Sequence, residues 1–282
     1  MKKLKILFLS FNFFFAAFFI VSCDEGGVIN IFSDSDDVSL GQQVVEEINA
    51  NPAEYPRYTG DPSVKIYIVD NIFNPILNSP KVAKKSIYRY SLEIVQDDSV
   101  LNAFALPGGP VYLYTGLLKY LDSEAALAGV VGHEIAHAER RHATQRMTAY
   151  YGVSVLLSLV LGQNPTEIAE IAANLFVGLA FLANSRANED ESDQYSIEYL
   201  KDTKYYPGGV KFFFEKMRDD GIVSSQSSQI LTFLSTHPDP IQRIASTNTR
   251  LTNAGISLRD YTTTGADIGR ESYLTNIKSK LP

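Results

Sequence analysis

The sequence is poor in the residues that define several large protein classes. Its 282 residues include one cysteine, no tryptophan and only four histidines, and the formal net charge is −7. A single cysteine excludes a disulfide framework and any zinc or iron–sulfur site built from several cysteines. The negative charge argues against a nucleic-acid-binding protein, which needs basic patches to neutralise phosphates. Because 45% of the residues are hydrophobic, the chain is not disordered either, and its length predicts one or two domains with an ordinary core.

The N-terminus has the pattern of a bacterial lipoprotein signal peptide. Three lysines within the first five residues precede an apolar run over residues 6–21, and the only cysteine, Cys23, ends a segment that resembles a lipobox. An uncleaved N-terminal anchor is the alternative, although the run is slightly short for a membrane-spanning helix. We therefore predict a signal peptide over residues 1–22 and lipidation at Cys23. The lipid would anchor a domain to a bacterial membrane, with the periplasmic face of the outer membrane as the expected place.

Beyond the cysteine, the sequence predicts an acidic tether followed by a mostly helical domain. Residues 23–37 are acidic and rich in small residues, which is typical of a solvated linker. The expected fold is α+β, with a domain over residues 38–260 that contains a small sheet, and a C-terminal tail over residues 261–282. Apolar spacing predicts helices over residues 37–51, 62–76, 122–141, 185–200 and 208–217, and another from residue 238. A strand is the alternative at the start of residues 62–76. Strands are predicted within residues 86–95, 102–106 and 111–115.

Two strongly apolar segments, residues 150–161 and 171–183, follow the longest predicted helix. Each is too short to span a membrane, for which about 20 residues are required. A buried helical hairpin is the simpler interpretation, and a lid that contacts the membrane is the alternative.

Residues 133–137 have the sequence His-Glu-Ile-Ala-His within the longest predicted helix. Histidines four apart lie on one helix face, so the imidazoles of His133 and His137 can both reach one metal ion. Glu134 lies about a quarter turn away, where a general base acting on a water at the metal belongs. An exposed pair of histidines is the alternative. Small neighbouring residues suggest instead a buried helix, in which two histidines and a glutamate without a partner would be costly. The motif therefore predicts a catalytic zinc site.

A catalytic zinc site requires a third protein ligand and one open position. The metzincin pattern, with a third histidine after the motif, is not met, and on a continuous helix His142 points away from the ligand face. The best carboxylate candidate is Glu189, although Asp190 and Glu191 compete with it. On a helix, Glu189 and Asp193 share a face, so Asp193 could accept a hydrogen bond from a ligand imidazole.

Four motifs follow one another along about residues 60–250. They are Asn102–Gly109, His133–His137 with Arg141 and His142, Ser185 and Arg186 with Glu189 and Asp193, and Thr236–Pro238 with Arg243. In this order they resemble the HtpX-related gluzincin zinc metallopeptidase family, whose periplasmic lipoprotein members are the BepA- and LoiP-like proteases. The resemblance implies a zincin-type peptidase domain with the small sheet beside the His-Glu-x-x-His helix.

The same resemblance implies roles for individual residues. It implies one Zn(2+) per chain held by His133, His137 and Glu189, with Glu134 as the base and Asp193 as the hydrogen-bond partner of a ligand. It also implies that the strand after the Pro-Gly-Gly turn lies at the sheet edge and faces the cleft, where an extended peptide could add to the sheet. The residues expected to contact substrate are Ala103, Phe104, Val111 and Tyr112.

Two further residues near these motifs have two interpretations each, and a third has one. The resemblance places His237 near the metal, as a transition-state donor or an inhibitory fourth ligand, and a plain residue at a helix start is the alternative. Arg243 is expected either to orient a site carboxylate or to pair with Asp239. We expect His142 to be structural and to pack the helix end with Arg141.

Together these features predict a lipid-anchored zinc metalloendopeptidase of the bacterial cell envelope that degrades misfolded or misassembled proteins. Its expected partners are unfolded polypeptides and, through the lipid, the membrane, whereas no nucleic acid is expected. A non-catalytic envelope chaperone or assembly factor is one alternative, against which the intact Glu134 argues. A metal-dependent hydrolase with a non-peptide substrate is another, which the strand-and-turn motif disfavours.

Overall fold

A computed structural model describes residues 22–23, 29–152, 184–224 and 236–282 of the chain. Nearly all of the predicted signal peptide and most of the apolar segments at residues 150–183 lie outside these described residues. Within the described ranges, none of the helices combines the length and the apolar character needed to span a membrane.

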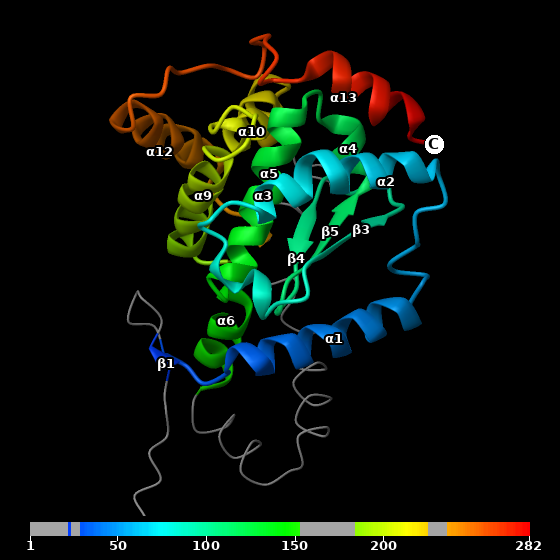
Figure 1. Ribbon diagram of the computed structural model, residues 1–282, viewed down its shortest axis with the longest axis vertical. Helices are drawn as coiled ribbons and strands as arrows, with labels where there is room; N and C mark the ends of the chain where they lie inside the picture. The colour runs from blue at the N-terminus through cyan, green and yellow to red at the C-terminus, as the bar shows by residue number, and fades with distance from the viewer. Residues whose placement is uncertain (1–21, 24–28, 153–183, 225–235) are drawn as a thin grey trace, which may run out of the picture.

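The fold is α+β, as predicted, and mostly helical with one small three-stranded sheet (Figure 1). The strands are β3 (Ser91–Val95), β4 (Ala103–Ala105) and β5 (Pro110–Tyr114), and a separate antiparallel pair is formed by β1 (Ser22–Cys23) and β2 (Ile29–Asn30). The helices are α1 (Asp34–Ala50), α2 (Pro62–Ile68), α3 (Asn74–Leu77), α4 (Thr115–Tyr120), α5 (Glu124–Glu139), α6 (His142–Tyr151), α9 (Arg186–Leu200), α10 (Gly209–Asp219), α12 (Pro240–Asn253) and α13 (Arg270–Asn276). A π-helical turn, η1 (Val69–Phe73), joins α2 to α3.

Helix α5 is the centre of the molecule, and every one of its residues is buried. Its start is fixed by Ser123, whose hydroxyl accepts a hydrogen bond from the backbone N–H of Ala126. Alanines and glycines on its surface allow the neighbouring helices α9 and α10 to approach closely. One close approach is at Gly129, where a Cβ atom would lie 2.0 Å from the backbone nitrogen of Val210 in α10.

We expect Gly129→Ala to destabilise the fold, because its methyl group would collide with backbone that cannot rotate away. The cost of such overpacking is about 1–3 kcal/mol or more, measured as a loss in the free energy of unfolding in urea. Gly132→Ala in the same helix is the matched control, since the nearest atoms to its Cβ would be side-chain atoms of Ser196 and Leu200 at 2.9–3.0 Å, with the backbone of Ser196 at an ordinary 3.5 Å. Equal losses in the two variants would contradict this interpretation of the α5–α10 contact.

The sheet has the order β3-β5-β4, with β3 parallel and β4 antiparallel to β5. The strand after the Pro-Gly-Gly turn, β5, is therefore the central strand and not the edge strand expected from the sequence. The turn makes this possible because Gly108 and Gly109 adopt positive φ angles of 72° and 114°, so that the chain reverses tightly and β5 enters between β3 and β4. The edge beside α5 is formed by β4, which contacts that helix.

Helix α1 lies across one end of the sheet, next to α6 (Figure 1). It begins with a capping box, in which Ser33 and Asp36 bond each other's backbone N–H groups. Asp37 is buried and accepts hydrogen bonds from the Tyr88 hydroxyl at 2.6 Å and from Arg141 Nε at 2.7 Å. The expected acidic tether over residues 23–37 thus has to be corrected at its end, because residues 34–37 belong to α1 and one of them is a buried partner of Arg141.

The residues predicted to form a C-terminal tail pack against the domain instead. Helix α13 lies at the end of the molecule opposite α1 (Figure 1), and the hydroxyl of its fully buried Tyr273 donates to the carbonyl of Leu118 at 2.6 Å. Ile268 and Ile277 are also fully buried in the main core. The apolar residues of this segment are widely spaced and its one α-helix is short, so no helical or strand periodicity marks it in the sequence.

Most predicted helices and strands are present, and their boundaries differ where the backbone changes conformation. The strand expected within residues 86–95 begins only at Ser91. The helix expected to start at Pro238 starts at Pro240, because Asp239 adopts a left-handed conformation with φ of 60°. The helix expected to reach Arg141 ends at Glu139, because Arg141 also adopts a left-handed conformation.

Candidate metal centre

Two histidines of α5 direct their Nε2 atoms toward each other. His133 and His137 are one turn apart, and their Nε2 atoms lie 2.9 Å from each other. Both imidazoles are buried, and burial holds the pKa of His137 well below its usual value, so His137 is neutral, as a metal ligand must be. Burial and Arg243 oppose protonation of His133, but Asp193 and Glu189 outweigh them and raise its pKa to about 9. A metal that binds there must displace a proton.

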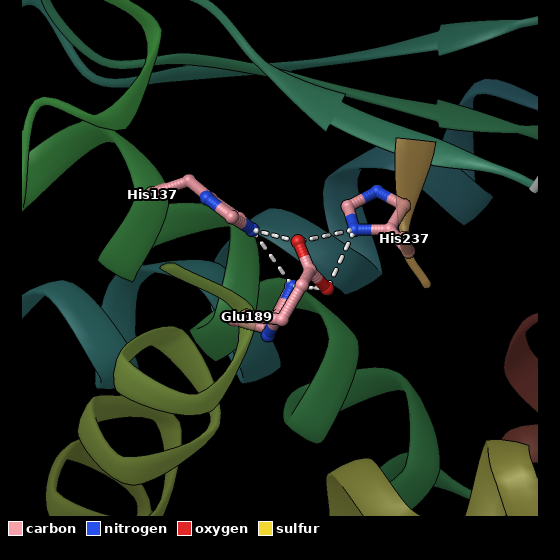
Figure 2. Close-up of side chains that lie close together, drawn as sticks. His137, Glu189 and His237 are labelled. Atoms are coloured by element: carbon pink, nitrogen blue, oxygen red, sulfur yellow. Dashed lines mark hydrogen bonds and ion pairs between the residues drawn. The ribbon is translucent and has the colours of Figure 1, made fainter. Parts of the chain in front are cut away.

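Helix α9 packs against α5 and brings the third donor. The carboxylate of Glu189 is buried, with Oε1 3.2 Å from His137 Nε2 (Figure 2). Its Oε2 lies 3.5 Å from His133 Nε2. In a tetrahedral zinc site with bonds of 2.0–2.1 Å, neighbouring donors are about 3.3 Å apart. The two imidazole nitrogens are 2.9 Å apart and lie 3.2 and 3.5 Å from the two Glu189 oxygens, which is close to this spacing, and two imidazoles with one carboxylate are a donor set that zinc accepts. These residues therefore fit zinc.

Asp193, one turn after Glu189, supports this donor set together with Arg243 of α12. Asp193 Oδ1 lies 2.9 Å from His133 Nδ1, which fixes the ring with its Nε2 toward the site. The Arg243 guanidinium donates to both oxygens of Asp193 at 2.8 and 2.6 Å, and to Glu189 at 2.6 Å. Arg243 therefore pairs with the site carboxylates and not with Asp239, which instead pairs with Arg186.

The charges around the site keep both carboxylates ionised. Burial opposes the ionisation of Glu189, but the neighbouring His237 and Arg243 hold the pKa of its carboxyl well below its usual range. Burial likewise opposes the ionisation of Asp193, and Arg243 outweighs it, so this pKa is also lowered. One buried guanidinium balances only one of the two negative charges. The proton on His133 balances the other, and once a metal displaces this proton the donor set and its partners carry a net negative charge, which favours a divalent cation.

Glu134 lies beside the donor set without belonging to it. Its side chain is buried, and burial raises the pKa of its carboxyl above the usual value. A raised pKa lies closer to neutral pH. A general base exchanges protons most efficiently when its pKa is near the working pH. The arrangement can therefore accept a proton from a water that the donor set holds.

His237 comes from the chain just before α12 and completes a buried group of three histidines and a glutamate, whose donor atoms lie within 4.8 Å of one another. Its Nδ1 is 3.1–3.2 Å from the two oxygens of Glu189, and its Nε2 is 3.8 Å from Glu134 (Figure 2). His237 thus contacts the third donor, Glu189, and also lies near the base, Glu134.

His142 contacts the site, although the sequence analysis assigned it to helix packing. After α5 ends, Arg141 adopts a left-handed conformation with φ of 63° and ψ of 28°, and α6 begins directly at His142. This reversal folds His142 back against His137, with their Nδ1 atoms 2.8 Å apart. The assumption of a continuous helix hid the contact. Arginine rarely adopts this conformation, and no local signal marks the break.

A cavity of about 200 Å³ opens beside the donor set. Its walls are α1 on one side and β4 on the other, and Glu134, His137 and His237 line its end. Of the residues expected to contact substrate, Phe104 lines this cavity and Ala103 lines a smaller one next to His133. Val111 and Tyr112 are buried in β5 and line neither, although the Tyr112 ring supports Phe104 by stacking on it at 4.9 Å.

Comparisons with known proteins agree with this geometry. The sequence profile of peptidase family M48 matches residues 69–251. The chain is 31% identical over 166 residues to the beta-barrel assembly-enhancing protease of Escherichia coli K12, covering 56% of this chain and 33% of that protein. It is 30% identical over 150 residues to the mitochondrial metalloendopeptidase OMA1 of Arabidopsis thaliana, covering 53% of this chain and 29% of that protein. The matched region thus spans about a third of the length of these relatives.

Proposed function

The chain belongs to peptidase family M48, and from this premise we propose that it is a zinc-dependent endopeptidase that cleaves unfolded or misassembled proteins of the bacterial cell envelope. The observation that carries the proposal is the convergence of His133, His137 and Glu189 beside Glu134, at the end of a cavity bordered by a sheet edge. The base next to the donor set distinguishes a peptidase from a chaperone with the same cleft, because a protein that only holds polypeptide has no use for it.

The proposed reaction is hydrolysis of a peptide bond with Glu134 as the proton carrier. A zinc ion in this site supplies a Lewis acid that polarises the scissile carbonyl and lowers the pKa of water. Glu134 takes a proton from the attacking water and passes it to the nitrogen of the breaking peptide bond. Arg243 and Asp193 hold the Glu189 carboxylate and the His133 ring in place, so that these groups do not reorganise during the reaction.

The substrate is proposed to bind as an extended strand along β4. The backbone of Phe104 pairs with Tyr112 of β5, and the backbone bonds of Asn102 and Leu106 also run toward β5. Because outward and inward groups alternate along a strand, the carbonyls of Ala103 and Ala105 face away from β5. A peptide that pairs with this edge would run past Glu134, with its side chains alternating into the cavity.

The test of the proposed function is cleavage of casein, used as an unfolded protein, by the full chain. We expect cleavage in the presence of zinc, its loss after treatment with a chelator and its return when zinc is restored. Binding of casein without any cleavage in the zinc-loaded protein would contradict a peptidase and favour a chaperone.

The proposed place of action is the envelope, with the domain anchored through a lipid on Cys23. The name of the Escherichia coli relative refers to the assembly of β-barrels, so misassembled outer-membrane proteins are the proposed substrates. We expect Cys23→Ser to release an active protein into the soluble fraction, because a serine cannot carry the lipid. Fractionation after a high-salt wash measures this. A Cys23→Ser protein that stays with the membrane would show that another segment is the main anchor.

A further inference from the structure

Helix α9 offers a third carboxylate to the histidines of α5, and it acts through His142. Glu191 lies two residues after Glu189, and its Oε2 atom is 2.8 Å from His142 Nε2. The other nitrogen of His142, Nδ1, is 2.8 Å from His137 Nδ1 and 3.3 Å from the Ser192 hydroxyl. The two imidazole rings are nearly perpendicular, at 77° with centroids 4.9 Å apart. A line of hydrogen bonds thus runs from Glu191 through His142 to His137.

Only one assignment of protons satisfies this line when His137 Nε2 serves as a donor to a metal. His137 Nδ1 then carries the proton and donates it to His142 Nδ1, which must accept. His142 in turn carries its proton on Nε2 and donates it to the Glu191 carboxylate. Arg140 Nε donates to the other oxygen of Glu191 at 2.9 Å, which holds that carboxylate in place.

The surrounding fold holds the His142 ring in this line of hydrogen bonds. The left-handed Arg141 that turns His142 toward His137 is itself held by Asp37 of α1, through bonds of 2.7 and 3.3 Å. His142 is buried, with 1% of its surface exposed, so its ring nitrogens bond to protein groups and not to bulk water. Asp190, which like Glu191 was an alternative to Glu189 as the third ligand, pairs with Arg250 away from the site.

We propose that Glu191 and His142 form a positioning relay that fixes the tautomer and orientation of His137 as a metal ligand, as Asp193 does directly for His133. The proposal rests on the proposed zinc site. It gives α9 three carboxylates with separate tasks: Glu189 as a donor to the metal, Asp193 as the partner of one ligand histidine and Glu191 as the partner of the other through His142. Partners of ligand histidines typically contribute 10- to 100-fold to metal affinity.

The test compares variants of His142 by zinc affinity, measured in competition with a chromophoric chelator, and by the visible spectrum of the Co(II)-substituted protein. We expect His142→Leu to weaken zinc binding about 10- to 100-fold and to change the Co(II) spectrum, because His137 loses its acceptor. His142→Asn should retain most of the affinity, since its side-chain oxygen can take the place of Nδ1 and accept the same proton. Asp190→Asn, a charge change on the same helix, is the control and should leave both readouts unchanged.

Equal losses in His142→Leu and His142→Asn, or wild-type affinity in both, would overturn the relay. If His142→Leu does not fold, Glu191→Ala decides the matter, because it removes the end of the relay at a partly exposed position. Unchanged zinc affinity and an unchanged Co(II) spectrum in Glu191→Ala would then overturn it. These outcomes presuppose a wild-type protein that binds zinc, and failure of the wild type to bind zinc or to cleave casein would instead refute the proposed function.

Discussion

Replacing Glu134 by glutamine is expected to abolish peptide cleavage while leaving zinc in place. Glutamine has nearly the same shape as glutamate, but its amide cannot accept a proton from water. Loss of a positioned general base typically costs about 100- to 10,000-fold in turnover. The ligands His133, His137 and Glu189 are unchanged, and glutamine fits the buried space that Glu134 occupies.

Zinc content and casein cleavage, measured on the same preparation, check this prediction. His137→Ala is the matched comparison, because it should lose both the metal and the activity. Retained activity in Glu134→Gln would show that another group acts as the base. Loss of zinc from this variant would show that Glu134 is itself needed to hold the metal.

The parts of the site that lie on regular helices could be predicted from the sequence. The spacing of His133 and His137 places both on one face of α5, and the same spacing places Glu189 and Asp193 on one face of α9. Helical periodicity fixes such relations within an element. The choice of Glu189 over its acidic neighbours, however, depended on the family resemblance, because several carboxylates of one helix are equivalent until its packing partner is known.

What the sequence did not reveal depends on backbone breaks and on partners far along the chain. The contact of His142 with His137 arises from one left-handed residue, Arg141, whose conformation is stabilised by Asp37, more than 100 residues away. The central place of β5 in the sheet likewise follows from its parallel pairing with β3. Apolar alternation indicates that a strand exists but carries no information on its neighbours. The edge position that the family resemblance implied for this strand was wrong, because β5 lies between β3 and β4.

Replacing His237 by alanine is expected to lower turnover about 100- to 1000-fold with zinc retained. His237 stands opposite His133 and His137, with Nδ1 near Glu189 and Nε2 facing Glu134 at 3.8 Å. The carbonyl oxygen of a substrate attacked by water next to Glu134 gains negative charge in this region. An N–H of His237 can stabilise that charge, and removal of one such donor has an effect of this size.

A rise in the turnover of His237→Ala would instead make His237 an inhibitory ligand of the metal. If its imidazole fills the open position of the resting site, it excludes the water that hydrolysis requires, and His237→Ala would then raise turnover and expose the metal to chelators. His237→Gln separates the two roles further, because it keeps an N–H donor and should recover part of the activity only if the donor matters. Unchanged turnover and zinc content in His237→Ala would make it a structural residue at the start of α12, and would contradict both roles.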